Sequence, residues 1–296
     1  MDGAKVRRCE GARVRLWEGA TVRMKLILAI GFLGLVAAIA SAQGAAPAQG
    51  GRGGGRGARA GGTPEENQRR QVLYDMADTI GMLRNPNEVD RLGSMNYWAT
   101  GTITSGGQTC KVVDYKASVN WILKGMRVDY KCDGSPQRHV EVVKDDLAWN
   151  ESEPGKGGAP APMTTKERAL FIWTLPAGAI KTANAAGAAT KIAMENGKTV
   201  LSYPIASLGA DMKVTLNKDS RIEQVESRMG GVTTVTTYEE YGDWNGADYL
   251  SDVMFPKHIV QKRAGMTVMD LTLTKTNTYN PYVIFPVPDA LKAGAR

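Results

Sequence analysis

The sequence predicts a mainly β domain with a few helices, and three observations lead to this class. Several segments beyond residue 110 alternate apolar and polar residues, two shorter segments have apolar residues at helical spacing, and residues 1–62 have the composition of a leader and a linker. Alternation with a period of two puts successive side chains on opposite faces of a strand. Because typical domains hold roughly 100 to 200 residues, we expect one β-rich domain at residues 63–288 and a flexible tail at residues 289–296.

Residues 1–42 have the features of a secretory signal peptide. An apolar run at residues 26–42 follows Lys25 and ends in Ala40-Ser41-Ala42, the pattern of small residues that precedes a signal-peptidase site. We therefore expect export and cleavage between Ala42 and Gln43, which would leave a periplasmic or secreted protein. The run is near the lower limit of length for a membrane span, so the alternative is an uncleaved anchor that would hold the chain to the membrane.

Two features of the first 62 residues do not belong to a folded domain. Residues 1–23 are longer than the usual basic region of a signal peptide, so a start at Met24 would make them an upstream extension. Residues 43–62 are rich in Gly, Ala and Arg and contain almost nothing that a core could bury, which predicts a disordered linker. An RNA contact through the Arg-Gly stretch is the alternative interpretation of this linker.

The net charge of +7 does not predict a nucleic-acid partner. Ten of the 37 basic residues but only three of the 30 acidic ones lie in residues 1–62, so the remaining chain is formally neutral. Binding to a phosphate backbone depends on a surplus of Lys and Arg on one face. The positive charge of this protein therefore belongs to its leader and linker.

The ordered region is expected to begin with a helix. Thr63 supplies an N-cap hydroxyl, Pro64 suits the first helical position, and Glu66 completes a capping box. Apolar residues then recur at helical spacing, namely Leu73, Met76, Ala77, Ile80 and Leu83. The helix should end before Asn85-Pro86.

Residues 117–132 predict a β-hairpin. The apolar positions alternate with polar ones on both sides of Lys124-Gly125, and they are Ala117, Val119, Trp121 and Leu123, then Met126, Val128, Tyr130 and Cys132. A two-residue turn at Lys124-Gly125 would pair Trp121 with Val128 and Val119 with Tyr130, so that the two apolar faces coincide.

Further strands and a second helical segment follow. Alternation or β-branched composition predicts strands at residues 139–144, 212–216, 232–239 and 269–273, the last with Met269, Leu271 and Leu273 on one face. Between these strands, Thr164 and Glu167 repeat the capping-box pattern, Pro176 interrupts the helix and Gly187 follows as a stop. Residues 280–296 contain Pro286 and Pro288 and are expected to be extended and peripheral.

Cys110 and Cys132 would remain after cleavage of the leader, and the sequence leaves their pairing open. Two cysteines in an oxidising compartment favour a disulfide. The predicted hairpin register, however, sets Cys132 opposite Ala117, about 24 Å along a straight strand from Cys110 at about 3.4 Å per residue. A bridge would therefore need a bend between residues 111 and 116.

No motif predicts catalysis, a metal or a cofactor. The two histidines, His139 and His258, lie in separate strand-like segments without a partner at metal-ligand spacing. The sequence also lacks the serine-hydrolase elbow, the zinc-protease motif and the phosphate-binding loop. We therefore assign no catalytic residue, although carboxylates brought together only by the fold would escape such a search.

The chain resembles an uncharacterised exported bacterial family and, more distantly, the outer-membrane lipoprotein carriers. The phrases that carry this resemblance are Met126-Arg127-Val128-Asp129-Tyr130, Ala148-Trp149-Asn150-Glu151, residues 238–244, Phe255-Pro256, and residues 270–274 with Asn280-Pro281. The resemblance implies a single curved antiparallel sheet or half-barrel, closed by the N-terminal helix and the mid-chain helical segment. Its concave side would hold an acyl chain or another apolar ligand.

We therefore expect a non-enzymatic exported protein that binds a hydrophobic molecule or lipid. The candidate binding residues alternate onto one face, and they are Trp121, Met126, Val128, Tyr130, Met269, Leu271 and Leu273. The plainer interpretation is that these side chains fill the core. A cell-envelope scaffold and a hydrolase with an unrecognised site are the alternatives from other classes.

Overall fold

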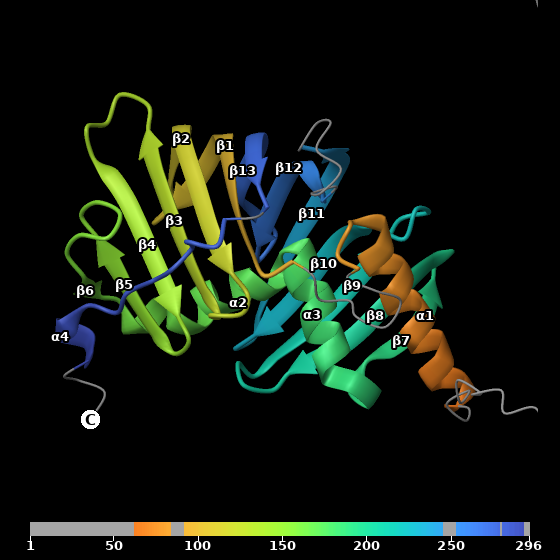
Figure 1. The fold of residues 1–296 in the computed structure, drawn as a ribbon. Helices are drawn as coiled ribbons and strands as arrows, with labels where there is room; N and C mark the ends of the chain where they lie inside the picture. The colour runs from red at the N-terminus through yellow and green to blue at the C-terminus, as the bar shows by residue number, and fades with distance from the viewer. Residues whose placement is uncertain (1–61, 84–91, 245–252, 279, 293–296) are drawn as a thin grey trace, which may run out of the picture. The chain divides into compact units, whose positions relative to one another are not determined.

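The computed structural model describes residues 62–83, 92–244, 253–278 and 280–292. The proposed signal peptide and nearly all of the proposed linker lie outside these residues, so the leader and its cleavage site stay predictions. In the described part of the chain, all strands belong to one 13-stranded antiparallel sheet that is not closed into a barrel (Figure 1). This confirms the predicted mainly β class with a single open sheet.

The sheet is one meander whose first and last strands meet in its middle. Its spatial order is β6-β5-β4-β3-β2-β1-β13-β12-β11-β10-β9-β8-β7. The strands are β1 (Ser94–Ser105), β2 (Gln108–Asn120), β3 (Gly125–Cys132), β4 (Arg138–Lys144), β5 (Leu147–Glu151), β6 (Ala159–Pro160), β7 (Lys191–Glu195), β8 (Lys198–Ile205), β9 (Ala210–Leu216), β10 (Ile222–Met229), β11 (Val232–Asp243), β12 (Met254–Arg263) and β13 (Met266–Asn277). Because β6 and β7 lie at opposite edges, the chain between them must cross the whole sheet.

Two helices make this crossing. They are α2 (Thr165–Thr174) and α3 (Pro176–Ala186), with short 3-10 turns at Pro162–Thr164 and Gly187–Ala189. α2 packs on β3, β4, β5 and β10, and α3 packs on β8, so the helices cover the face of the sheet that holds the main core. Pro176 opens α3 and separates it from α2, and Gly187 ends α3 with φ 54°. The predicted helical segment is therefore two helices.

The N-terminal helix, α1 (Pro64–Thr79), packs against α3 and β7. Thr63 accepts a hydrogen bond from the Glu66 backbone N–H at 3.2 Å, as the capping box predicts. The predicted capping box at Thr164 is wrong. The Thr164 hydroxyl donates to the Ala161 carbonyl at 3.0 Å, within the 3-10 turn, and makes no cap bond to α2.

The predicted register of the β2–β3 hairpin is also wrong. Val119 pairs with Met126 and Ala117 with Val128, so the turn comprises residues 121–124 and each pairing moves by four residues along β2. Asn120 explains the longer turn, because its side-chain oxygen accepts a hydrogen bond from the Leu123 N–H at 2.9 Å. An even shift keeps the paired strand residues on their predicted face, whereas Trp121 and Leu123 lie in the turn instead of in the strand.

The corrected register brings the two cysteines together. A bulge in β2 between Val112 and Asp114 places Cys132 opposite Val112. Cys110 and Cys132 are joined by a disulfide, with their Cα atoms 5.6 Å apart. The separation inferred for a straight strand was wrong because it rested on the two-residue turn.

The C-terminal segment forms a second, smaller core on the opposite face of β4 and β5 (Figure 1). Val283 and Phe285 are buried there with Val140, Val142 and Trp149. The Asn120 amide holds the segment by donating to the Val283 carbonyl at 2.9 Å. The segment then enters the short helix α4 (Asp289–Lys292). The predicted peripheral position is therefore wrong for residues 283 and 285.

Candidate functional site

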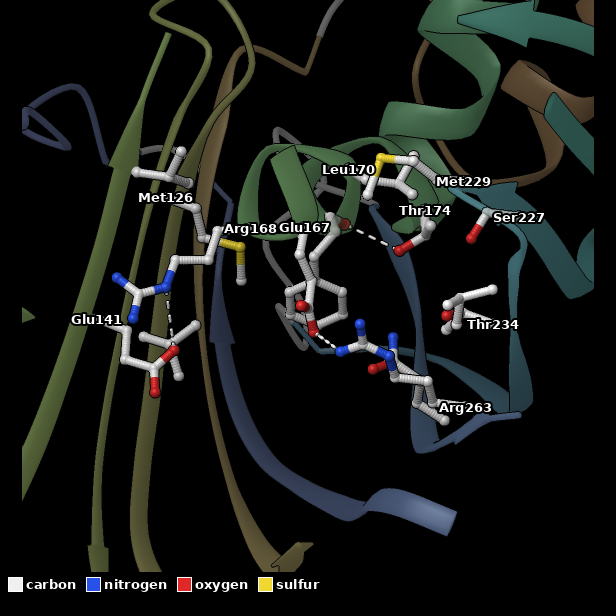
Figure 2. Close-up of a pocket in the computed structure, with 15 residues that line it drawn as sticks. Met126, Glu141, Glu167, Arg168, Leu170, Thr174, Ser227, Met229, Thr234 and Arg263 are labelled. Carbon is white, nitrogen blue, oxygen red and sulfur yellow. Dashed lines mark hydrogen bonds and ion pairs between the residues drawn. The ribbon is translucent and has the colours of Figure 1, made fainter. Parts of the chain in front are cut away.

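A cavity of about 180 Å³ lies between α2 and the covered face of the sheet, and we call it the inner cavity. Figure 2 shows that β3 and β4 form one of its walls and β10, β11 and β12 the other, with α2 above both. Its lining residues are Met126, Val128, Glu141, Val143, Glu167, Arg168, Leu170, Phe171, Thr174, Ser227, Met229, Val232, Thr234, Gln261 and Arg263.

Strand alternation directs the sheet residues into this space. Met126 and Val128 are two apart on β3, and Ser227 and Met229 are two apart on β10, so each pair shares one face. On α2, the lining positions 167, 168, 170, 171 and 174 recur at intervals of three or four, which places them on one side of the helix. The inner cavity is therefore lined by regular elements rather than by loops.

Most of the inner cavity is apolar. Val128 and Met229 on the covered face of the sheet, and Phe171 on α2, are each only partly buried. Met126 is 2% exposed and Leu170 is 7% exposed. Apolar groups from α2 and from both halves of the sheet thus surround a space that they do not fill.

Arg168 is the best-anchored charged group of the inner cavity. Its Nη1 donates to the Trp149 carbonyl at 2.9 Å and its Nη2 donates to Asn150 Oδ1 at 2.7 Å. Its Nε lies 3.3 Å from Glu141 Oε2, an ion pair without hydrogen-bond geometry. Burial lowers the pKa of Arg168, but an arginine keeps its proton in proteins. Arg168 thus carries a fixed positive charge between α2 and β4.

A second ion pair joins α2 to the far wall. The Arg263 guanidinium on β12 donates to the Glu167 carboxylate on α2 (Figure 2). Both side chains are about half exposed, at 42% and 52%, so the pair contributes little to stability. Both glutamates of the inner cavity thus face arginines, and among the described residues its lining contains no histidine, lysine or cysteine to activate the Ser227 hydroxyl. This arrangement offers no support for the hydrolase hypothesis.

The structure separates the residues that the sequence proposed as one site. Met126 and Val128 line the inner cavity, whereas Trp121 lines a different cavity on the other side of α2. Tyr130 is buried and stacks on His139 with ring centroids 4.8 Å apart. Burial is also the main cause of the raised pKa of Tyr130. Met269, Leu271 and Leu273 belong to the main core and line neither cavity.

Sequence reasoning missed most of the inner cavity. Glu141 lies in a predicted strand, and Arg168 and Phe171 lie in a predicted helix, so their local structure was foreseen but their position was not. Met229 and Arg263 reach the cavity from strands far along the chain, and no local signal in the sequence reports that proximity.

The described residues contain neither a cluster of metal-binding side chains nor a helix suited to span a membrane. No group of three or more His, Cys, Asp or Glu side chains among them is arranged to hold an ion. No helix in the described ranges combines the length and apolar character needed to cross a bilayer.

The chain has a distant likeness to a solved structure. No protein-family model matches the chain, and no curated protein matches it. Among solved structures, the chain is similar to a LolA superfamily protein from Nitrosomonas europaea, with 13% sequence identity and a TM-score of 0.44 over 75% of this chain and 96% of that one. At this identity and TM-score, the likeness assigns no ligand and no residue role to this chain.

Proposed function

We propose that the protein binds an apolar molecule, such as an alkyl chain, in the inner cavity. The observation that carries this proposal is the unfilled space between α2 and the sheet, whose walls are mostly apolar. Protein interiors are packed with few voids larger than a water molecule. An engineered apolar cavity of roughly 150 Å³ admits small apolar ligands, so by size alone a space of about 180 Å³ is large enough to serve as a binding site.

The size of the inner cavity sets a condition on longer ligands. Pockets for drug-sized ligands measure roughly 300–1,000 Å³, whereas this one measures about 180 Å³. One end of an alkyl chain fits the space as it stands, and a longer ligand requires α2 to move away from the sheet. The junction at Leu175, between α2 and α3, is the natural hinge because Pro176 interrupts the helix there.

We further propose that the protein acts after export. The apolar run at residues 26–42 and the small residues at 40–42 support a cleaved leader. The Cys110–Cys132 disulfide supports an oxidising compartment, where such bonds form and persist. A hydrophobic molecule in the aqueous space outside the cytoplasm exposes apolar surface to water, and binding in an apolar cavity removes that surface from water.

Calorimetric titration with 1-decanol tests the proposed binding. Val128→Phe adds a ring to the wall of the inner cavity, so it should weaken decanol binding by about tenfold, which is roughly 1.4 kcal/mol of binding free energy. Val268→Phe is the matched control, because Val268 is partly exposed on β13 and lines neither cavity. Decanol that fails to bind the wild-type protein, or that binds all three proteins equally, would contradict the proposal.

A further inference from the structure

One wall of the inner cavity carries two hydroxyl groups on neighbouring strands. Ser227 on β10 and Thr234 on β11 are directly paired residues of the sheet, and both line the cavity opposite Met126 (Figure 2). The Cβ atoms of residues paired in this way lie about 4.5–5.5 Å apart. One oxygen atom placed between the two side chains can therefore form a hydrogen bond with each hydroxyl.

Neither hydroxyl has a partner in the protein itself. Within the part of the chain that the structure describes, the side chains of Ser227 and Thr234 make no hydrogen bond. Ser227 is also only 2% exposed, so its hydroxyl has little access to bulk water. A buried hydroxyl without a partner costs free energy, and most buried polar groups in proteins are satisfied for that reason. The two hydroxyls are therefore available to a molecule that enters the inner cavity.

The other uncharged polar side chains of the inner cavity are already engaged. Gln261 donates from its side-chain amide to the Thr236 hydroxyl at 3.2 Å. The Thr174 hydroxyl donates to a backbone carbonyl of its own helix, α2, at 2.9 Å. Among the described lining residues, the free hydrogen-bonding capacity is thus concentrated at Ser227 and Thr234.

The charged residues of the inner cavity balance one another. Glu141 lies against Arg168, and Glu167 is paired with Arg263. An ionised head group placed among them would find no unpaired counter-charge, and burial of a charge without a partner is costly. A neutral head group avoids this cost, so the lining favours an uncharged ligand.

We propose, on the basis of the apolar site proposed above, that the ligand of the inner cavity is an uncharged amphiphile, which is an alkyl chain with one neutral hydrogen-bonding group such as a hydroxyl. The head group forms hydrogen bonds with Ser227 and Thr234, and the chain contacts Met126 and Val128 on the opposite wall. A site built to hydrogen-bond a ligand hydroxyl discriminates against an analogue that lacks it. Ser227 and Thr234 are therefore the residues that determine specificity.

Paired titrations with 1-hexanol and 1-chlorohexane test this specificity. The two molecules share a six-carbon chain, and only hexanol carries a hydroxyl. Methyl NMR gives each affinity from the shifts of Met126 and Met229, which line the inner cavity. In Ser227→Ala, hexanol affinity should fall about fivefold, as expected for the loss of one hydrogen bond, and chlorohexane affinity should stay within about twofold of the wild type.

Two more variants complete the comparison. Thr234→Val removes the second hydroxyl with little change of shape, so it should have the same selective effect on hexanol. Ser202→Ala is the matched control and should change neither affinity, because Ser202 is exposed on β8 and lines neither cavity. Equal losses for the two ligands in Ser227→Ala, or undiminished hexanol affinity when Ser227→Ala and Thr234→Val are combined, would overturn the assignment of the hydroxyls.

Thermal unfolding without ligand checks that Ser227 has no structural role. Ser227→Ala loses no hydrogen bond within the protein, so its Tm should equal or exceed that of the wild type. A fall of more than about 5 °C, which is a substantial loss of stability for a domain of this size, would show that the hydroxyl has a partner in the folded protein. That result would overturn the proposal.

Charged analogues test the neutral head group. Hexanoate and hexylammonium at pH 7 carry the same length of chain with a negative or a positive charge. Both should bind the inner cavity at least about tenfold more weakly than hexanol, because neither finds an unpaired counter-charge there. Binding of either one within tenfold of hexanol would overturn the choice of a neutral head group.

The chlorohexane titration also separates failure of this specificity from failure of the proposed function. Chlorohexane that shifts Met126 and Met229 in the wild type, with hexanol affinity unaffected by both hydroxyl variants, would leave the apolar site standing and overturn the role of Ser227 and Thr234 alone. If neither chlorohexane nor hexanol shifts these methyl signals in the wild type, the apolar site itself is contradicted, and the specificity falls with it.

Discussion

Substitution of Gly125, the first residue of β3, is predicted to destabilise the protein because of a long-range contact with Phe285. A Cβ atom added at Gly125 would lie 2.3 Å from Phe285 Cδ2 and 2.6 Å from its Cε2. The backbone of Gly125 is not left-handed, and the residue of this turn with positive φ is Lys124, at 47°. Gly125→Ala therefore introduces a steric clash without backbone strain, in contrast to the two-residue turn predicted from the sequence.

The packing around Phe285 determines how much the free energy of unfolding should change. Its ring is 3% exposed and lies against Val140, Val142 and Trp149. Phe285→Ala should lower the free energy of unfolding by about 3–5 kcal/mol, as is usual for removal of a buried ring. Gly125→Ala should lower it by about 1–3 kcal/mol through overpacking.

The double variant, Gly125→Ala with Phe285→Ala, tests whether the two losses of stability have one cause. Once Phe285 is alanine, the methyl group at position 125 has space, so most of the cost of Gly125→Ala should disappear. We expect the two effects to fall short of additivity by at least about 1 kcal/mol. Urea unfolding followed by tryptophan fluorescence measures all four proteins. Additive effects, or a Gly125→Ala variant as stable as the wild type, would refute this role of the contact.

Two further predictions concern the disulfide that joins β2 to β3 and the histidine of β12. Cys132→Ser removes the bond to Cys110 across 22 residues, so the free energy of unfolding should fall by about 3 kcal/mol, and a reducing agent should destabilise the wild type but not the variant; a loss below about 1 kcal/mol in urea would contradict this. The pKa of His258 is raised mainly by its hydrogen bond to Asp270, at 2.8 Å, and also by Glu239. Protonated His258 should therefore stabilise the sheet fully below the unfolded pKa of about 6.5 and lose this effect as the pH rises through the folded pKa. His258→Gln should flatten the dependence of Tm on pH in that window, and an unchanged dependence would count against the interaction.

The faces of the strands could be predicted from the sequence, whereas the strand register could not. Alternation at Met126, Val128 and Tyr130 assigns these side chains to one face, and any even shift of register keeps that assignment. The register itself depends on the length of the turn, which Asn120 sets through a side-chain hydrogen bond. Propensity alone favoured the shorter turn at Lys124-Gly125.

The buried part of the C-terminal segment carried a weak signal. Val283, Phe285 and Val287 alternate with a period of two, but Pro286 and Pro288 obscure the pattern. The surface that this segment covers is the outer face of β4 and β5. Nothing near residue 285 in the sequence reveals that face, because strand order is a property of the whole sheet.

The two cavities depend on contacts between distant segments. Met126 and Met229 lie on opposite walls of the inner cavity because the sheet curves and the crossing helix α2 must pass over it. Trp121 and Val128 seemed to form one site from their predicted pairing, but the longer turn places them on opposite sides of α2. The sequence shows the chemical character of each residue, but it does not show which distant residues lie next to it in a cavity.

The most direct test of the proposed function is a methyl NMR titration with 1-decanol. Methionines are natural probes, because Met126 and Met229 line the inner cavity, whereas Met163 and Met266 are 95% and 70% exposed and line neither cavity. If an alkyl chain binds in the inner cavity, the methyl signals of Met126 and Met229 should shift and show nuclear Overhauser contacts to the chain, and those of Met163 and Met266 should not. Contacts only to the exposed methionines, or no saturable shift at Met126 and Met229, would contradict binding in the inner cavity.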